Sequence, residues 1–403
     1  MSLCINPQCQ KPNNSDTIIF CQGCGSELLL DGRYRVLQEL GQGGFGTTYE
    51  VIDIDRHYWV LKVLMDNHPK YVELFQQEAQ VLGVLNHPGI PKVSLDSYFT
   101  YFAMGRSEPQ HCLVMEKIEG LNLDDYIERR GHRPIKQKRA LRWLAELTLI
   151  LKQVHSHNFF HRDIKPANIM LRSNGCLALI DFGTAREVSD SYVSKQASGQ
   201  ITGVVTQGYT PMEQMKGKAV LQSDFYALGG TMIFLLTAEN PGHFYDFTTD
   251  KIIWRDRVTD LSPKFADLID YMMAFSPLQR PKSSQEIFHK IVAIDPSLRL
   301  LAEDFHSPSI SRQSTSFSSA SSIAANVVNN NPDTPAFSNS QITPEFVEGC
   351  RQELAAFIGP MANVVCKRTF KQNPNISQQE FCAILAKTIA VPAQARDFMQ
   401  RLT

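Results

Sequence analysis

The sequence has neither a long apolar run nor an excess of charge of either sign. Its longest apolar stretch, from Ala227 to Ala238, contains two glycines. A membrane-spanning helix needs about 20 apolar residues, so no membrane insertion is expected. The 40 Lys and Arg residues balance the 41 Asp and Glu residues, whereas nucleic-acid and membrane-surface binders carry a basic excess. Because the first residues also lack the pattern of a signal peptide, we expect a cytoplasmic protein that binds no nucleic acid.

Cysteine is sparse except at the N-terminus. The chain has nine cysteines, and four of them, Cys4, Cys9, Cys21 and Cys24, lie in the first 24 residues. The other five are scattered among apolar neighbours: Cys112, Cys176, Cys350, Cys366 and Cys382. An odd count with one tight cluster favours a metal site plus buried thiols over a disulfide framework.

Composition divides the chain into four parts. Residues 1–27 hold the cysteine cluster, and residues 33–295 alternate strand-like and helix-like patterns without interruption. Residues 304–343 are rich in serine and asparagine, which predicts a flexible linker because so few apolar groups cannot offset chain entropy. Helical patterning returns in 344–403, where Ser377 and Glu380 have capping-box spacing and Pro392 begins a further helix.

A glycine-rich segment lies between two strand-like runs, Tyr34–Leu40 and Thr47–Ile52. Glycines at 41, 43 and 46 allow the backbone to approach a polyphosphate and to direct N–H groups at it. A plain glycine-rich hairpin would have the same sequence pattern. A dinucleotide-binding fold needs a helix after the glycines, and a strand is predicted here instead.

A lysine and a glutamate follow at informative positions. Lys62 ends the apolar run Tyr58–Leu61, and Glu78 lies in a predicted helix over Tyr71–Leu85. Phe75 and Leu82, three residues before and four after Glu78, place the carboxylate on the apolar face of that helix. A carboxylate there is costly unless it is paired, so we expect a Lys62–Glu78 ion pair.

Two further motifs carry a family resemblance. They are His161-Arg-Asp163-Ile-Lys165-Pro-Ala-Asn168 and Ile180-Asp181-Phe182-Gly183. Together with the preceding motifs, and in the same order, they resemble the eukaryotic-like protein kinases over roughly residues 33–295. The resemblance implies an α+β, two-lobed protein-kinase fold, to which the patterns at the two ends add a small zinc ribbon and a small all-α module.

The resemblance also implies a role for each matching residue. Asp163 would accept the substrate hydroxyl proton, Lys165 would lie near the γ-phosphate and mark serine/threonine specificity, and Asn168 and Asp181 would hold Mg²⁺ or Mn²⁺. Lys62, held by Glu78, would contact the α- and β-phosphates. The segment Met115–Ile118 matches the hinge between the two lobes. It would bind adenine, with Met115 as gatekeeper. The expected ATP-binding residues are Leu40, Gly41, Gln42, Gly43, Gly44, Phe45, Gly46, Thr47, Thr48, Lys62, Glu116 and Ile118.

The segment after Gly183 resembles a kinase activation loop. It ends at Gly208–Glu213. The family pattern pairs Glu213 with Arg280, and it implies that Asp224 supports the catalytic loop. Thr206 matches the substrate-facing threonine. We expect autophosphorylation at Thr202 first and Ser198 second, because Arg162, beside the catalytic aspartate, would offer a cation to the phosphate.

The N-terminal cysteines form two pairs, Cys4-x₄-Cys9 and Cys21-x₂-Cys24. Four thiolates on two turns suit tetrahedral Zn²⁺, and the metal would supply the folding energy that so short a segment lacks. A redox-active thiol cluster is the alternative. The arrangement resembles a group of cyanobacterial serine/threonine kinases with an N-terminal four-cysteine motif, and we expect this segment to pack on the small lobe and to tune activity.

These patterns together predict an ATP- and Mg²⁺-dependent serine/threonine kinase that acts on proteins and whose N-terminal cysteines bind zinc. The C-terminal module is expected to form homo-oligomers or to dock partners. Two alternatives remain. One is a catalytically silent nucleotide-binding scaffold, for which Thr48 and Val60 matter because they depart from the usual adenine-packing residues. The other is a zinc- or redox-dependent interaction protein whose kinase domain is secondary.

Overall fold

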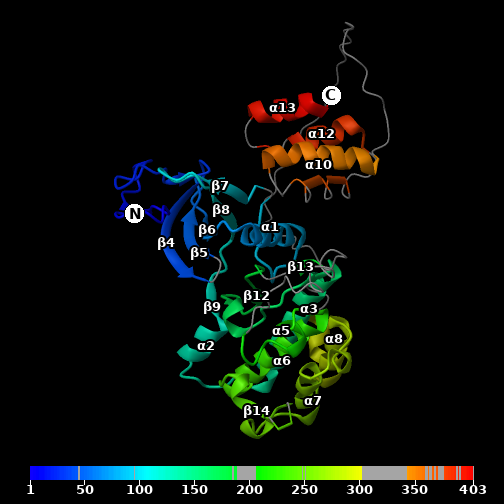
Figure 1. The fold of residues 1–403 in the computed structure, drawn as a ribbon. Coiled ribbons are helices and arrows are strands. Elements are labelled where there is room, and N and C mark those ends of the chain that lie inside the picture. Colours follow the sequence, from blue (N-terminus) through cyan, green and yellow to red (C-terminus); the bar gives the residue numbers. More distant parts are fainter. Residues whose placement is uncertain are drawn as a thin grey trace, which may run out of the picture.

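The computed structural model describes most of the chain in two lobes followed by a small helical module (Figure 1). The described residues are 1–43, 46–94, 96–183, 186–187, 206–246, 248–249, 251–301, 343–358, 362, 365–366, 369–370, 376–386, 389 and 392–402. The predicted linker, residues 304–343, therefore lies outside them except for its last residue. The same holds for the predicted phosphosites, Ser198 and Thr202, and for Gly44 and Phe45.

The small lobe is built on a six-stranded antiparallel sheet of order β3-β4-β5-β6-β8-β7. Its strands are β3 (Leu29–Leu30), β4 (Tyr34–Gln42), β5 (Gly46–Ile52), β6 (Tyr58–Leu64), β7 (Tyr98–Tyr101) and β8 (Gln110–Glu116). Val51, Leu61 and Val63 are fully buried on one face. Since side chains alternate along a strand, Lys62 and its cross-strand neighbour Thr48 lie on the other face.

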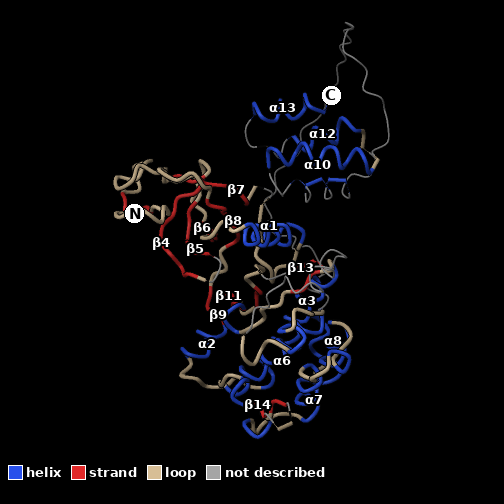
Figure 2. The backbone as a smooth tube through the Cα atoms, in the orientation of Figure 1, coloured by secondary structure: helices blue, strands red, loops and turns tan. Residues whose placement is uncertain are grey.

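Helix α1 (Pro69–Val84) lies against that other face, beside the sheet in Figure 2. It begins two residues before the predicted start because Pro69 suits the first helical position and the His68 side chain accepts a hydrogen bond from Lys70 N. Phe75 and Leu82 pack in the apolar core that the helix shares with the sheet and the large lobe. The predicted apolar face is therefore confirmed, and it carries Glu78 into the interior.

The large lobe is mostly helical. Its helices are α2 (Leu123–Arg129), α3 (Gln137–Ser156), α5 (Met212–Met215), α6 (Leu221–Thr237), α7 (Pro263–Met272) and α8 (Ser284–Ile294). A small antiparallel sheet joins β9 (Gly120–Asn122), β11 (Ile169–Arg172) and β12 (Leu177–Leu179), while β10 (Phe159–Phe160) pairs with β13 (Arg186–Glu187) and β14 (Tyr245–Asp246) with β15 (Lys251–Ile252). Because α3 packs on both α6 and α8, the loop between β10 and β11 rests on a rigid base.

The N-terminal segment packs on the small lobe, as predicted. Strands β1 (Ser2–Leu3) and β2 (Asn13–Asn14) pair with each other, and Ile5 enters the apolar core of the outer sheet face. Ser26 Oγ accepts a hydrogen bond from Met104 N at 2.9 Å, and Tyr101 Oη donates to Glu27 O at 2.8 Å. These contacts tie the cysteine segment to the end of β7 and to the loop that follows it.

The C-terminal module has an apolar core of its own. It contains α10 (Pro344–Ile358), α12 (Gln378–Ala386) and α13 (Pro392–Leu402). The predicted capping box is confirmed, because Ser377 N donates to Glu380 Oε2 at 2.9 Å and Glu380 N donates to Ser377 Oγ at 3.3 Å. The expectation of buried thiols holds for Cys112, Cys350, Cys366 and Cys382, whereas Cys176 is only half-buried.

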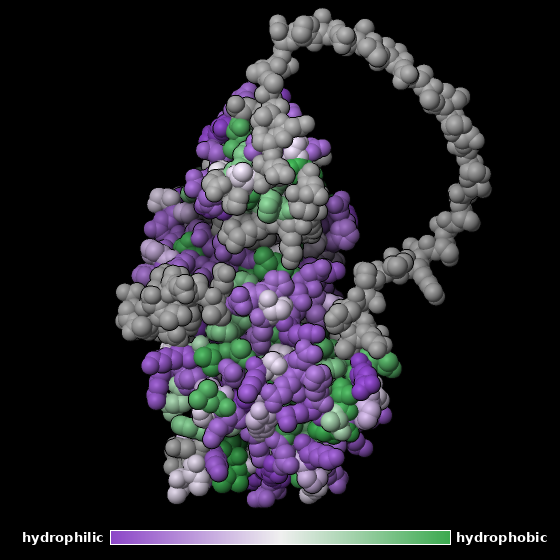
Figure 3. Space-filling view, turned by 90° about the vertical axis from the view of Figure 1, so that its right-hand side faces the viewer, coloured by the Kyte–Doolittle hydropathy of each residue, from purple (hydrophilic) through white to green (hydrophobic). Residues whose placement is uncertain are grey.

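The described surface offers no sign of a membrane-spanning element. Across the described ranges, no helix combines the length and the apolarity that crossing a bilayer requires. Figure 3 shows hydrophilic and hydrophobic residues interspersed over the face turned to the viewer, rather than gathered into one apolar band.

Candidate active site

Three charged side chains from distant parts of the sequence meet between the lobes. Lys62 Nζ on β6 lies 2.9 and 2.8 Å from the two carboxylate oxygens of Glu78 on α1. It also lies 2.8 Å from Oδ1 of Asp181, which follows β12. The expected Lys62–Glu78 pair is therefore present, and Lys62 joins it to the predicted metal ligand.

Lys62 and Asp181 stabilise each other's charged form. Burial opposes the protonated form of Lys62, but the charges of Glu78 and Asp181 raise its pKa above the ordinary value. The charge of Lys62 in turn lowers the pKa of Asp181 to about 2, against the effect of burial. At neutral pH the site therefore presents a permanent cation and an ionised aspartate whose side chain is 47% exposed.

Any side chain at Gly183 would crowd this cluster. A Cβ atom there would lie 3.1 Å from Glu78 Oε2, 3.2 Å from Lys62 Nζ and 3.3 Å from Asp181 Oδ1. Asp181 itself has φ of 63°, a left-handed conformation that is uncommon outside glycine. Such strain at a side chain that faces the cleft is typical of functional positions.

Asp163 lies at the centre of a second cluster, in the loop between β10 and β11. Its Oδ2 accepts hydrogen bonds from Lys165 Nζ and from Asn168 Nδ2, each at 2.8 Å. Asn168 Nδ2 also donates to the Asp163 carbonyl at 2.9 Å. Thr206 Oγ1 donates to Asp163 Oδ1 at 3.4 Å. The carboxylate is thus oriented by a cation and an amide, and a threonine from the far end of the activation segment reaches it.

Asp224 on α6 fixes the backbone of this loop. Its carboxylate is fully buried and accepts hydrogen bonds from the backbone N–H groups of His161 and Arg162 at 2.9 and 2.8 Å. His155 Nε2 lies 2.9 Å from the same carboxylate. Arg162 has φ of 70°, so these bonds hold a strained residue directly before Asp163. The sequence had given Asp224 this supporting position only through the family pattern.

A buried ion pair anchors the end of the activation segment. Arg280, whose side chain is fully buried, lies 2.6 Å from Glu213 Oε1. Its guanidinium also donates to the carbonyls of Ala274 and Phe275 at 2.7 and 3.0 Å, and Ser223 Oγ donates to Glu213. The predicted pairing of Glu213 with Arg280 is present, and α5 is fixed by it to the segment before α8.

The predicted nucleotide-binding residues fall into two groups. The side chain of Thr48 lies on the inner face of the sheet, as does that of Lys62. The side chain of the neighbouring Thr47 is buried on the outer face, next to Tyr49. At Gly46 a Cβ atom would lie 2.3 Å from Val63 O. Of the predicted list, Leu40, Gly41, Gln42 and Gly43 are exposed at the end of β4. The side chain of Thr47 thus points away from the face where a nucleotide would lie.

The hinge offers a backbone donor rather than a free side chain. Glu116 Oε1 accepts from Arg172 at 2.8 Å and its Oε2 from Lys92 N at 3.1 Å, so this carboxylate is committed to structure. Among the described residues, no acceptor faces the Ile118 N–H. Met115, at the end of β8, is buried beside Val60 in the core. An adenine ring would therefore be recognised by the hinge backbone, with Met115 and Val60 as apolar neighbours.

The residues present fit a nucleotide and a divalent cation. Asp181 is a hard oxygen donor, exposed to the cleft, and Asn168 uses its Nδ2 group on Asp163, which leaves the Oδ1 oxygen as its ligand atom. Oxygen donors of this kind are those that Mg²⁺ prefers. Open space surrounds Gly41, where an added Cβ atom would meet nothing within 4 Å.

The four N-terminal cysteines also converge. Their Sγ atoms all lie within 4.8 Å of one another, with Cys4–Cys24 and Cys9–Cys21 each separated by 3.6 Å. Zn–S bonds of about 2.3 Å in a tetrahedron place sulfurs about 3.8 Å apart, so the set fits zinc. At Gly23 a Cβ atom would lie 3.1 Å from Cys9 Sγ, which explains the glycine in this turn.

Hydrogen bonds to the sulfur distinguish Cys21 from Cys4. Burial raises the pKa of Cys4, whereas Cys21 has a lowered pKa because donors to its sulfur outweigh burial. Those donors include Asn14 Nδ2 and Gly23 N, each 3.4 Å from Cys21 Sγ. Ser26 Oγ lies 3.1 Å from Cys24 Sγ. Sequence reasoning missed both Asn14 and Ser26, because neither residue belongs to a periodic pattern or a spaced motif.

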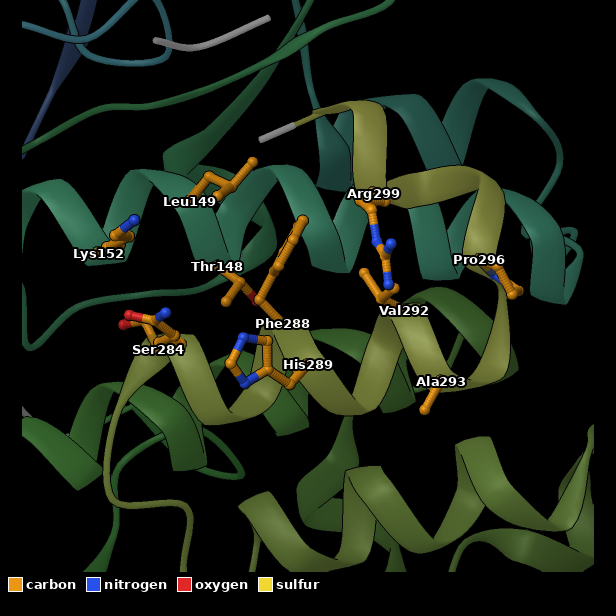
Figure 4. A pocket seen from close by; sticks show the side chains of 11 residues that line it. Thr148, Leu149, Lys152, Ser284, Phe288, His289, Val292, Ala293, Pro296 and Arg299 are labelled. Atoms are coloured by element: carbon orange, nitrogen blue, oxygen red, sulfur yellow. The ribbon is translucent and has the colours of Figure 1, made fainter. Parts of the chain in front are cut away.

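A cavity of about 610 Å³ on the large lobe is separate from these clusters. It lies between α3 and α8, and Figure 4 shows Leu149 and Lys152 on the former opposite Phe288 and His289 on the latter. No residue of the predicted active site lines it.

Comparisons with known proteins agree with this geometry. A family model described as the protein kinase domain matches residues 34–300, and a domain of unknown function, DUF8082, matches residues 345–403. Serine/threonine-protein kinase B of Synechocystis is 37% identical over 71% of this chain and 51% of its own length. Serine/threonine-protein kinase PknA of Nostoc is 35% identical over 66% of this chain and 48% of its own length.

A third relative, serine/threonine-protein kinase F of Synechocystis, is 32% identical over 71% of this chain and 62% of its own length. The chain thus spans about half the length of the first two relatives. The kinase model covers the segment that contains Lys62, Asp163 and Asp181. The chain belongs to the eukaryotic-like serine/threonine protein kinase family.

Proposed function

We propose that this protein transfers the γ-phosphate of ATP to serine and threonine hydroxyls of proteins, its own chain included. One observation carries the proposal: Lys62, Glu78 and Asp181 form one charged cluster, while Asp163, Lys165 and Asn168 form another in the loop before β11. Phosphoryl transfer depends on positioning and charge neutralisation rather than on covalent chemistry. These residues supply both.

Each residue has a distinct task in the reaction. Asp163 accepts the proton of the acceptor hydroxyl as its oxygen attacks the γ-phosphorus and ADP leaves. Lys165, 2.8 Å from Asp163, places its positive charge beside the transferred group, and Lys62 holds the nucleotide phosphates. Asn168 and Asp181 would hold Mg²⁺, and the bound metal would neutralise phosphate charge. Thr206, in contact with Asp163, helps to place the acceptor hydroxyl and favours serine or threonine.

Transfer of labelled phosphate from Mg-ATP tests this function. We expect wild-type protein to label a basic serine/threonine acceptor and itself, and Lys62→Met to lose at least a hundredfold in kcat/KM because Glu78 and Asp181 lose their shared cation. Lys264→Met, at an exposed position on α7, is the matched control. The scaffold alternative predicts ATP binding without transfer by any variant.

The autophosphorylation sites stay predictions, because Thr202 and Ser198 lie outside the described residues. Peptide mapping of the self-labelled protein addresses them directly. Phosphate between Gly183 and Pro211 is the expected result, and its absence from active protein would exclude this mode of activation.

We propose further that the four cysteines hold a structural zinc ion that couples to the small lobe. Ser26 supports this coupling, since its hydroxyl lies 3.1 Å from Cys24 Sγ and also accepts from Met104 N. When bound, the metal would supply the folding energy that the short segment lacks. Residues 1–27 would then act as a clamp on the strand pair β7–β8.

Metal analysis tests the zinc site. We expect about one zinc per wild-type chain, none in Cys21→Ser/Cys24→Ser, and an unchanged content in Cys176→Ser, whose thiol lies on the large lobe. Loss of zinc should lower the thermal stability of the small lobe and the kinase activity of the protein. Full activity without zinc would exclude regulation through this segment, and zinc-free wild-type protein that forms disulfides under oxidant would favour the redox alternative.

The described part of residues 344–403 has an apolar core of its own, and we propose that it forms a docking or self-association module. The molar mass of the protein in solution tests self-association.

A further inference from the structure

One stretch of the large lobe is strongly basic. Residues 129–142 contain seven cations and no carboxylate, although the chain as a whole is balanced at a net charge of −1. The cations are Arg129, Arg130, Arg133, Lys136, Lys138, Arg139 and Arg142. They span the end of α2, the connecting loop and the start of α3, at the edge of the large lobe where α2 is labelled in Figure 1.

The structure gathers five of these cations around a cavity of about 660 Å³, which we call the basic pocket. They are Arg130, Lys136, Lys138, Arg139 and Arg142. Tyr126, Trp143 and Leu171 supply an aromatic and apolar wall, and no carboxylate lines the cavity. A concave site with an apolar wall and a charged rim is typical of a binding site for another molecule.

Most of this charge has no partner within the protein. Arg142 bonds to Glu146 at 3.0 Å, but over the described residues no carboxylate lies within 4.0 Å of Lys136, Lys138 or Arg139. The Arg139 guanidinium lies 5.8 Å from the ring centre of Trp143 and donates to Tyr126 Oη. The aromatic wall therefore orients Arg139 without neutralising it.

Local stability does not explain these positions. Lys136 is the N-cap of α3 and makes no side-chain capping bond, and the first turn contains no acidic residue. Cations at this end of a helix oppose its dipole, whereas acidic residues stabilise it. A local choice that disagrees with the fold is expected mainly at functional sites.

We propose that the basic pocket binds an acidic segment of a protein substrate, with an apolar side chain against the half-buried Tyr126 and Leu171. This docking site rests on the proposed kinase function and deepens it. Leu171 lies three residues after Asn168, about 10 Å along an extended strand, so one substrate can reach both sites. Opposite charge supplies the attraction. Nucleic acid fits less well, because the pocket is a local concavity on a chain without net positive charge.

Binding of a labelled 12-residue peptide of Glu and Asp with two leucines tests the proposal on the full chain. We expect Lys136→Glu/Lys138→Glu/Arg139→Glu to weaken binding at least tenfold. Lys264→Glu/Lys282→Glu/Lys290→Glu changes the net charge equally at exposed positions on the same lobe and should bind like wild type. Fusing the acidic peptide to an acceptor sequence should lower KM for wild type and control, while kcat stays unchanged.

Each outcome has a defined meaning. Equal peptide affinity for the two triple variants would overturn the docking site, as would displacement of the peptide by an RNA oligonucleotide at lower concentration than by the unlabelled peptide. An acceptor without the acidic segment should be phosphorylated equally by all three proteins. If none of them phosphorylates it, the kinase function fails, whatever the binding result.

Discussion

Asp163→Asn should reduce phosphate transfer to protein acceptors by about 10²–10⁴-fold in kcat, the range associated with removal of a general base. The substitution keeps the size and planarity of the side chain but removes the oxygen that accepts the substrate proton. Lys165 and Asn168 can still donate to the remaining oxygen, as they do to Oδ2 at 2.8 Å. The loop should therefore keep its shape, and KM for ATP should change little.

Two measurements make this result specific. Thermal unfolding and nucleotide affinity should match the wild type, which separates lost chemistry from lost structure. Asp267→Asn, at an exposed carboxylate on the large lobe, should retain wild-type kcat. Unchanged transfer by Asp163→Asn would remove this residue from the mechanism.

The sequence alone was enough to single out the two motifs expected to carry the chemistry, because each motif is a continuous run of residues. Asp163, Lys165 and Asn168 lie in one short run and contact one another. The contact between Asp181 and Lys62 joins distant parts of the sequence and was not predicted. The Lys62–Glu78 pair, by contrast, was predictable from physics alone, since a glutamate on the apolar face of a helix needs a cation. The structure confirms that pairing at 2.8 Å.

Contacts across the fold were not predictable in the same way. The basic pocket arises where α2, the start of α3 and the β11–β12 turn meet, and no single stretch of sequence encodes its apolar wall. The support that Ser26 and Asn14 give to the cysteines depends on how the N-terminal segment folds back on itself. The assignment of Thr47 to nucleotide binding treated neighbouring strand residues alike, although their side chains alternate between the two faces of the sheet.

Arg280→Met should lower the free energy of unfolding by about 3–5 kcal/mol, the cost of breaking a buried ion pair from one side. Glu213, whose side chain is 13% exposed, would keep a charge without its partner. The carbonyls of Ala274 and Phe275 would also lose their donors. At about 2–4 °C per kcal/mol for a domain of this size, the melting temperature of the kinase domain should fall by about 6–20 °C.

The double variant shows whether the charge or the packing is responsible. Glu213→Met/Arg280→Met removes both charges, so it should be less destabilised than the sum of the two single variants. Arg255→Met serves as the control, because Arg255 pairs with Asp267 and Asp270 at the surface, where such pairs contribute at most about 1 kcal/mol. Strict additivity of the Glu213 and Arg280 effects would contradict a direct ion pair. Non-additivity together with loss of activity would instead show that this pair holds the end of the activation segment in the position from which Thr206 reaches Asp163.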